Sequence, residues 1–402
     1  MATGSDKFPT MYPVEGFRLG TTSAGIKVAG RKDMVLMQIA EGSTTAAVFT
    51  QNKFCAAPVI VAKQHLQQTA PGYLLVNTGN ANAGTGDQGI ADTLSCCQAV
   101  ADENGAEIQQ ILPFSTGVIG EPLPVDTICN AVPASKENLA VDGWHDAAEG
   151  ILTTDTRPKG ASIQCDINGS QVTITGICKG SGMVKPNMAT MLGFVATDAA
   201  IDEELLHAAL RKANGKSFNR ITVDGDTSTN DAVMLVATGA SGVVIDESNF
   251  EPFLAQLTSI FTKLAQSIVR DGEGANKFVT VNVEGAETVQ EALSVAYAVA
   301  ESPLVKTALT ASDPNWGRIL AAVGRADVSD LDVSKIQIHL NSVLIAENGG
   351  RASSYSEAQG QKAMQAEDIE ITIQLNRGQV CETLWTTDLS YEYVRINAEY
   401  RT

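Results

Sequence analysis

The sequence is poor in basic residues for its length. Lysine and arginine together number 28 of 402 residues against 46 aspartates and glutamates, so the formal net charge at pH 7 is −18. Binding to a nucleic-acid backbone requires clustered positive charge, so this deficit argues against a DNA- or RNA-binding protein. Apolar runs long enough to cross a bilayer are also missing, because the best candidate, residues 292–300, is short and broken by polar residues. We expect a soluble protein, with enough apolar residues (44%) to fill a core.

Targeting and disulfide signals are also missing. The first ten residues contain an early acid and no apolar stretch, which fits neither a secretory signal nor a transit peptide. The seven cysteines are odd in number and never spaced as Cys-x-x-Cys, so neither a disulfide framework nor a zinc ribbon is indicated. We expect reduced thiols and a cytoplasmic location.

The four histidines, at positions 65, 145, 207 and 339, are scattered singly, and none forms a cluster at metal-ligand spacing. We therefore expect no metal and no bound cofactor. His207 falls in an amphipathic helical pattern and His339 in an alternating strand, positions typical of structural roles. A nucleophilic enzyme with this sequence would need a base other than histidine.

Strand signals predict antiparallel pairs in two places. Residues 161–177 alternate around Asn168-Gly169, a dipeptide that supplies the positive φ angles of a tight hairpin turn. Residues 369–385 show a similar pattern around Asn376-Arg377-Gly378, which predicts a second hairpin.

Helical periodicity predicts three amphipathic helices over residues 88–104, 202–214 and 249–270, the last of which Asn249 could cap. Strands with segregated helices favour a layered α/β sandwich over a doubly wound parallel sheet. The residue pattern changes after the glycine-rich residues 271–276, which predicts a domain boundary near residue 280. This boundary gives a catalytic sandwich domain at 1–280 and a smaller α/β domain at 281–402.

Three segments resemble phosphate- or metal-binding motifs, but the residues around or within each segment do not fit the motif. Residues 84–89 match Gly-x-Gly-x-x-Gly, but six residues separate them from the preceding strand, whereas a dinucleotide-binding turn leaves its strand directly. Residues 215–217 lack the rest of a P-loop. Residues 224–231 resemble a calcium loop with Thr229 and Leu235 at positions that need glycine and glutamate. That last loop is either a polar turn or part of a pocket lining, and the residues alone do not decide between these.

The segment 179–198 contains the candidate catalytic nucleophile. A glycine-rich loop runs through Pro186-Asn187 into Ala189-Thr190 and then into an apolar strand. A threonine hydroxyl held against the preceding carbonyl can attack it, and hydrolysis of the resulting ester leaves Thr190 as a new N-terminus. Its free amine, with an ordinary pKa of about 7.7–8.0, could act as the base for its own hydroxyl. A threonine that opens a strand is also common, so the residues alone leave both interpretations open.

The segment resembles the signature of the ornithine acetyltransferase family, the bifunctional arginine-biosynthesis enzymes whose precursors cut themselves before a threonine. The resemblance extends over essentially the whole chain. It includes the blocks at 77–84, 115–120, 153–159, 222–231, 270–277, 313–318 and 397–402.

This resemblance implies roles for single residues. Cleavage between Ala189 and Thr190 would release Thr190 as the nucleophile that carries the acetyl group, and Thr116 and Gly117 match the oxyanion pair. The positions that match substrate-binding residues are Thr153, Lys179, Thr190, Glu273, Asn397 and Thr402. Lys179 would face a carboxylate and Glu273 an amine. Because Thr402 ends the sequence, a C-terminal tag should impair turnover.

The resemblance also implies an activity and an assembly. The enzyme would move acetyl from N2-acetylornithine to glutamate by a ping-pong route, with acetyl-CoA as a second donor. Its fold would be an αββα sandwich like that of self-cleaving aminopeptidases, with a smaller C-terminal α/β domain, and residues 1–189 and 190–402 would form an α2β2 heterotetramer. Two alternatives are an N-terminal-threonine hydrolase, in which water resolves the acyl-enzyme, and a binding protein that never cuts.

Overall fold

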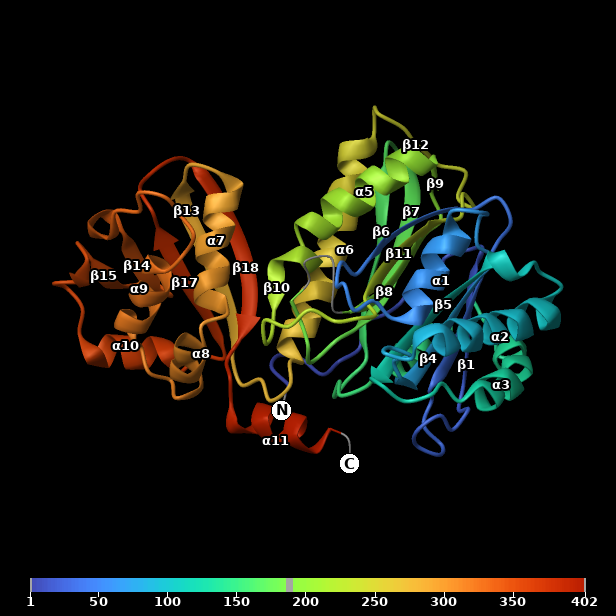
Figure 1. The fold of residues 1–402 in the computed structure, drawn as a ribbon. Helices are drawn as coiled ribbons and strands as arrows, with labels where there is room; N and C mark the ends of the chain where they lie inside the picture. Colours follow the sequence, from blue (N-terminus) through green and yellow to red (C-terminus); the bar gives the residue numbers. More distant parts are fainter. Residues whose placement is uncertain (1, 186–190, 401–402) are drawn as a thin grey trace.

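The computed structural model describes residues 2–185 and 191–400. Its N-terminal part contains two sheets that pack face to face (Figure 1). The first is ordered β1 (Phe17–Thr22), β2 (Met34–Ile39), β4 (Tyr73–Asn80), β5 (Ile111–Val118). The second is ordered β3 (Thr44–Phe49), β11 (Ala232–Ala237), β8 (Leu192–Thr197), β7 (Ser170–Lys179), β6 (Lys159–Ile167).

The alternation of strand side chains builds the layers. In β4, Leu74 and Val76 point between the sheets, where they join Phe194 and Met234 of the second sheet in one buried cluster. Leu75 points outward to the helices α1 (Ala57–Leu66), α2 (Gly86–Asn104) and α3 (Val125–Glu137). The outer face of the second sheet is covered by α5 (Glu203–Gly215) and α6 (Phe250–Arg270), and the short α4 (Trp144–Gly150) adds Trp144 to the inter-sheet core. The predicted αββα sandwich is confirmed.

The C-terminal part adds a third, mixed sheet. It is ordered β10 (Ile221–Thr222), β18 (Val380–Thr387), β13 (Phe278–Ala286), β17 (Asp368–Gln374), β14 (Gln337–Leu340), β15 (Val343–Glu347), β16 (Gly350–Arg351). The helices that contribute to its buried apolar face are α7 (Val289–Ala300), α8 (Pro303–Thr310), α9 (Trp316–Gly324) and α10 (Glu357–Met364). The short strands β9 (Ala200–Ile201) and β12 (Val244–Ile245) pair with each other, and α11 (Tyr391–Glu399) follows β18.

The buried cluster of the outer sandwich layer includes Phe278, and that of the third sheet begins with Val279. The third sheet nevertheless takes β10 from the preceding part of the chain, because Ile221 pairs with Trp385. A division into 1–280 and 281–402 therefore stays a prediction. In the part of the chain that the structure describes, no helix has the length and apolarity of a membrane span.

The first predicted hairpin is confirmed and the second is wrong. β6 and β7 pair antiparallel around Asn168 and Gly169, which have φ angles of +54° and +83°. β17 and β18 do not pair with each other, because β13 lies between them, parallel to β17 and antiparallel to β18. Residues 376–378 instead cross the end of β13, and the Gly378 N–H donates to the carbonyl oxygen of Gly285.

The three predicted helices exist with ends within two residues of the prediction. Asp202 caps α5, since its carboxylate accepts from the Leu205 N–H at 2.9 Å. Asn249 does not cap α6. Its amide turns back to the preceding loop, where it accepts from the Asp246 N–H and donates to the Val244 carbonyl.

Candidate active site

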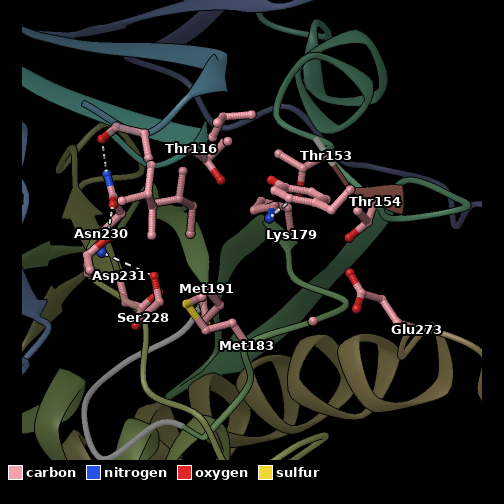
Figure 2. Close-up of a pocket in the computed structure, with 18 of the residues that line it drawn as sticks. Thr116, Thr153, Thr154, Lys179, Met183, Met191, Ser228, Asn230, Asp231 and Glu273 are labelled. Carbon is pink, nitrogen blue, oxygen red and sulfur yellow. Dashed lines mark hydrogen bonds between the residues drawn. The ribbon is translucent and has the colours of Figure 1, made fainter. Parts of the chain in front are cut away.

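A cavity of about 370 Å³ collects the predicted site residues. Its lining includes Thr116, Gly117, Thr153, Lys179, Glu273 and Asn397. Figure 2 shows Thr116, Thr153, Lys179 and Glu273 around this space, with Asn230 and Asp231 on the other side. Ala189, Thr190 and Thr402 lie outside the described residues. Met191, which follows Thr190 in the sequence, lines the cavity.

The end of β5 carries Thr116 and Gly117, which match the oxyanion pair, and we call this part of the cavity wall the oxyanion corner. β4 and β5 run parallel, with Gly79 opposite Gly117, and both glycines have positive φ angles, +112° and +140°. A Cβ on Gly117 would lie 2.2 Å from the carbonyl carbon of Gly79. Only glycine therefore allows the two strands to approach at this point. The close approach fixes the backbone on which Thr116 and the Gly117 N–H are carried.

Asn230 ties this corner to the second sheet. Its side-chain amide donates to the carbonyl oxygens of Ala81 (2.6 Å) and Ser115 (2.9 Å), and its oxygen accepts from the Thr229 hydroxyl at 2.5 Å. The Ser115 hydroxyl donates in turn to Asn77 at 2.5 Å. The network is buried, so losing a partner would leave polar groups unsatisfied. Residues 228–231 of the former calcium-loop candidate are thus pocket lining.

Buried charges orient Lys179. Its ammonium donates to the Thr153 hydroxyl at 2.8 Å and lies 3.7 Å from the carboxylate of Asp155. Lys159 bridges Asp155 and Asp271, and all three side chains are almost completely buried. Burial opposes ionisation of Asp155, but the ammonium groups of Lys159 and Lys179 outweigh it and hold the pKa of that carboxyl well below its usual range. The Gly180 N–H also donates to Asp155, which fixes the start of the glycine-rich loop.

Glu273 lines the cavity on the same side as Thr153, Thr154 and Lys179 (Figure 2). Its carboxylate accepts from the Asn397 amide at 2.7 Å, and its backbone N–H donates to the Ser181 carbonyl. A Cβ on Gly182 would lie 2.3 Å from the Glu273 carboxyl carbon, so a larger residue there would displace the Glu273 carboxylate. Burial raises the pKa of Glu273, while the bonds from Thr154 and Asn397 act in the other direction. An acidic group held this way suits a cationic partner.

Asp224 fastens the glycine-rich loop just before residue 186. Its carboxylate accepts from the backbone N–H groups of Met183 (2.6 Å) and Val184 (2.9 Å), and Tyr393 of α11 donates to it at 3.3 Å. On the other side of the segment, the Met191 carbonyl accepts from Ala232 N–H. The chain is thus anchored on both sides of Ala189 and Thr190.

The histidines do not line this cavity. His145 lies near Asp146 and Glu149 in an exposed group with the spacing of metal ligands. The Lys32 ammonium, however, is 2.8 Å from Asp146 and 2.6 Å from Glu149, so a cation already occupies those carboxylates. His207 lies on α5 and His339 on β14, as predicted.

Several lining residues were not singled out from the sequence, namely Thr154, Gly182, Met183, Asn230 and Tyr400. Thr154 and Asn230 lie within matched blocks, so those blocks were the available signal. Gly182 and Met183 belong to the glycine-rich segment. Tyr400 also lies within a matched block, 397–402.

Comparisons with known proteins identify the family. The ArgJ family model matches residues 18–402. The chain is 57% identical to the arginine biosynthesis bifunctional protein ArgJ of Pseudomonas syringae pv. tomato and 58% identical to that of Pseudomonas fluorescens, and both alignments cover 100% of each chain. The crystal structure of the argJ protein from Bacillus halodurans is 39% identical, covers 52% of this chain and 99% of that one, and superposes with a TM-score of 0.50. The chain therefore belongs to the ArgJ family of bifunctional acetyltransferases of arginine biosynthesis.

Proposed function

We propose that this acetyltransferase carries the acetyl group on Thr190 between N2-acetylornithine and glutamate. One observation supports the proposal most strongly. The residues matched to the oxyanion pair and to substrate binding, from five separate segments of the chain, line a single cavity together with Met191. Residues with only structural roles would have no reason to converge on one space.

Activation is a self-cleavage. The Thr190 hydroxyl attacks the Ala189 carbonyl carbon, the peptide C–N bond breaks, and water then hydrolyses the ester to leave a free Thr190 amine. The hydrogen bonds of Met183 and Val184 to Asp224, and of the Met191 carbonyl to the Ala232 N–H, hold the chain on both sides of this peptide bond. The amine then serves as the base for the hydroxyl.

Acetyl transfer occurs in two halves. The Thr190 oxygen attacks the acetyl carbon of N2-acetylornithine, the C–N bond breaks, and ornithine leaves with the hydroxyl proton. The glutamate amine then attacks the acetyl ester and returns a proton to Thr190. In both halves the alkoxide would accept from the Thr116 hydroxyl and the Gly117 N–H, a contact worth about 3–4 kcal/mol. The reaction uses only groups of the chain and its substrates.

Substrate recognition follows from the two charged groups in the cavity. The α-carboxylate shared by N2-acetylornithine and glutamate would pair with Lys179, which Asp155 and Thr153 hold in place. The side-chain ammonium of N2-acetylornithine would pair with Glu273. Asn397 and Thr402 would close the cavity over the substrate.

Processed fragments 1–189 and 190–402 would stay together. β7 precedes the cleavage point and β8 follows it, and the two strands pair antiparallel from Lys179–Leu192 to Ile174–Thr197. Both strands are also almost entirely buried. We include an α2β2 heterotetramer, acetyl-CoA as a second donor and a cytoplasmic location in the proposal.

The test separates a transferase from an N-terminal-threonine hydrolase. Purified enzyme is incubated with N2-acetylornithine alone, and then with glutamate. We expect one equivalent of ornithine, one acetyl group retained on fragment 190–402, and N-acetylglutamate only after glutamate is added. Continuous acetate release without glutamate would support the hydrolase, and absence of any acetylated fragment would contradict an acetyl-threonine.

A further inference from the structure

The turn that carries Glu273 lies beside the segment that leads into α11. Residues 271–277 join α6 to β13, and residues 388–390, which we call the connector, join β18 to α11. β13 and β18 pair antiparallel, with Phe278 opposite Thr387, so the residues before one strand run next to the residues after the other. The contacts between the turn and the connector therefore bear on where Glu273 lies.

The Asp388 carboxylate holds the end of the turn. Asp388 is buried, and its Oδ1 accepts from the backbone N–H groups of Asn276 (2.8 Å) and Lys277 (3.1 Å). Its Oδ2 accepts from the Asn276 amide (3.1 Å) and from the Thr310 hydroxyl of α8 (3.0 Å). Each of these partners donates, and a carboxylate offers acceptor oxygens only, whereas a side-chain amide would bring a second donor against them. An ionised carboxylate is therefore the group that fits this position.

Ser390 holds the turn next to Glu273. Its hydroxyl donates to the Gly274 carbonyl at 2.7 Å. Gly274 has a positive φ, +70°, and a Cβ there would lie 2.6 Å from the Tyr393 backbone nitrogen. The turn thus lies directly against the connector and the start of α11, so a shift of the connector would move Glu273 with it.

The connector is also fixed to α8. The Leu389 N–H donates to the Lys306 carbonyl at 3.2 Å. The buried Lys306 ammonium donates to the Thr386 hydroxyl at 3.0 Å and to the Thr387 carbonyl. Burial lowers the pKa of Lys306 to about 8, and the charge of Asp388 opposes that shift. Asp388 therefore links the turn to the third sheet and its helices.

We propose that Asp388 is a positioning residue for the acetyl donor: it holds the turn 271–277 so that the Glu273 carboxylate faces the side-chain ammonium of N2-acetylornithine. The inference rests on the proposed function, in which Glu273 is the partner of that ammonium. Glutamate, the acceptor, carries no side-chain ammonium. Asp388 should therefore matter for the half of the reaction that uses N2-acetylornithine and not for the half that uses glutamate.

The test compares the two half-reactions, since in a ping-pong reaction kcat/KM for each substrate depends only on its own half. Asp388→Asn keeps the size of the side chain and places an NH2 group against donors. We expect kcat/KM for N2-acetylornithine to fall about tenfold and kcat/KM for glutamate to change by less than about twofold. Calorimetric titration with ornithine should show binding weakened by about tenfold as well, and this measurement does not depend on turnover.

A double variant shows whether Asp388 acts through Glu273. In a Glu273→Ala background, adding Asp388→Asn should change kcat/KM for N2-acetylornithine by less than about twofold, because the group that Asp388 positions is absent. Ser390→Ala removes one bond to the turn and should lower the wild-type value about threefold, so this milder variant decides the question if Asp388→Asn does not fold. Asp198→Asn is the matched control. The Asp198 carboxylate also accepts from a backbone N–H but does not line the cavity, so both substrates should be unaffected.

No loss for N2-acetylornithine, or equal losses for both substrates, would overturn the proposal. Losses that multiply in the double variant would also overturn it, because Asp388 would then act through another group. Failure of the proposed function would be seen differently, as absent transfer from N2-acetylornithine in the wild type.

Discussion

The ammonium of Lys179 does not stand alone in the cavity wall. Lys159 neutralises Asp155 and Asp271 behind it, and Asp155 together with the Thr153 hydroxyl fixes the direction of the Lys179 side chain. A buried cluster of this kind costs little only when every member is paired, which is the case here. The consequence is a lysine whose position is set before substrate arrives.

Glu273 gives a prediction for the pH dependence of the reaction. Because burial raises the pKa of Glu273, its carboxylate becomes protonated at a higher pH than an ordinary glutamate, whose pKa is about 4.3. As pH falls through that raised pKa, kcat/KM for N2-acetylornithine should fall. Glu273→Gln should lower kcat/KM at neutral pH about 10- to 100-fold and remove this acid limb. Asn397→Ala removes a bond that lowers the pKa and should move the limb to higher pH. Protonation of the Thr190 amine gives its own limb at higher pH, so only the second, more acidic inflection reports Glu273. If that inflection persists in Glu273→Gln, Glu273 is not its source.

Asn230 gives a prediction for positioning. Asn230→Ala removes the bonds that hold Ala81 and Ser115, so Thr116 and Gly117 should lose their alignment. We expect kcat to fall about 10- to 100-fold with little change in KM. Asn249→Ala is the matched control, because Asn249 is also buried and bonded to backbone groups but does not line the cavity. A similar loss of kcat in both variants would indicate a general loss of stability instead.

The sequence motifs indicate the candidate site residues but not the charged groups that hold them in position. Thr116, Gly117, Thr153, Lys179, Glu273 and Asn397 were found by matched motifs, and the cavity brings them together. The pairing of Asp155 with Lys159 and Asp271 could not be read from the sequence, since more than 100 residues separate Asp271 from the other two. Only folding places such charges in one buried cluster.

At the paired ends of β4 and β5, the close approach of the two backbones restricts residue 117 to glycine. Gly117→Ala would force a Cβ against the Gly79 carbonyl and a φ of +140° on alanine. We expect a loss of about 2–4 kcal/mol in the free energy of unfolding, with acetyl transfer abolished. Denaturant unfolding and the transfer assay measure the two effects.

Gly120→Ala controls for the φ strain alone. Gly120 also has a positive φ, +83°, but a Cβ there meets nothing within 4 Å. That variant should be strained by about 1 kcal/mol and remain active. Full activity of Gly117→Ala would show that the close approach is not needed for the oxyanion corner.

The strands also show which pairings local sequence patterns can predict and which they cannot. Asn168-Gly169 defines its own turn through positive φ angles, so the β6–β7 hairpin was predictable from local residues. Residues 376–378 carry equally good turn residues, yet β13 lies between the strands that they connect. Turn residues indicate where the chain reverses, whereas the partner of each of these strands lies 90 or more positions away in the sequence.

In the whole molecule, the helix α11 lies near the C-terminal end of the chain (Figure 1), and its Asn397 lines the cavity. Asn397 bonds to Glu273 and Tyr393 to Asp224, while no residue of α11 is buried. The helix therefore contributes contacts to the site and little to the apolar core.

Truncation after Ser390 should separate these roles. We expect the thermal unfolding midpoint to change little, because no buried apolar side chain is removed. The value of kcat/KM should fall about a hundredfold or more, because Glu273 and the loop held by Asp224 lose their partners. An active truncated enzyme would contradict the role given to α11, and a large drop in the unfolding midpoint would place the helix in the core.

The intact mass of freshly purified protein shows whether Thr190 becomes a free N-terminal nucleophile. We expect two species in place of the 42.3 kDa chain, residues 1–189 and 190–402, with the second beginning Thr190-Met191-Leu192 on N-terminal sequencing. Thr190→Ala should yield only the uncut chain. A wild-type preparation that contains only the 42.3 kDa species and still transfers acetyl groups would contradict this expectation.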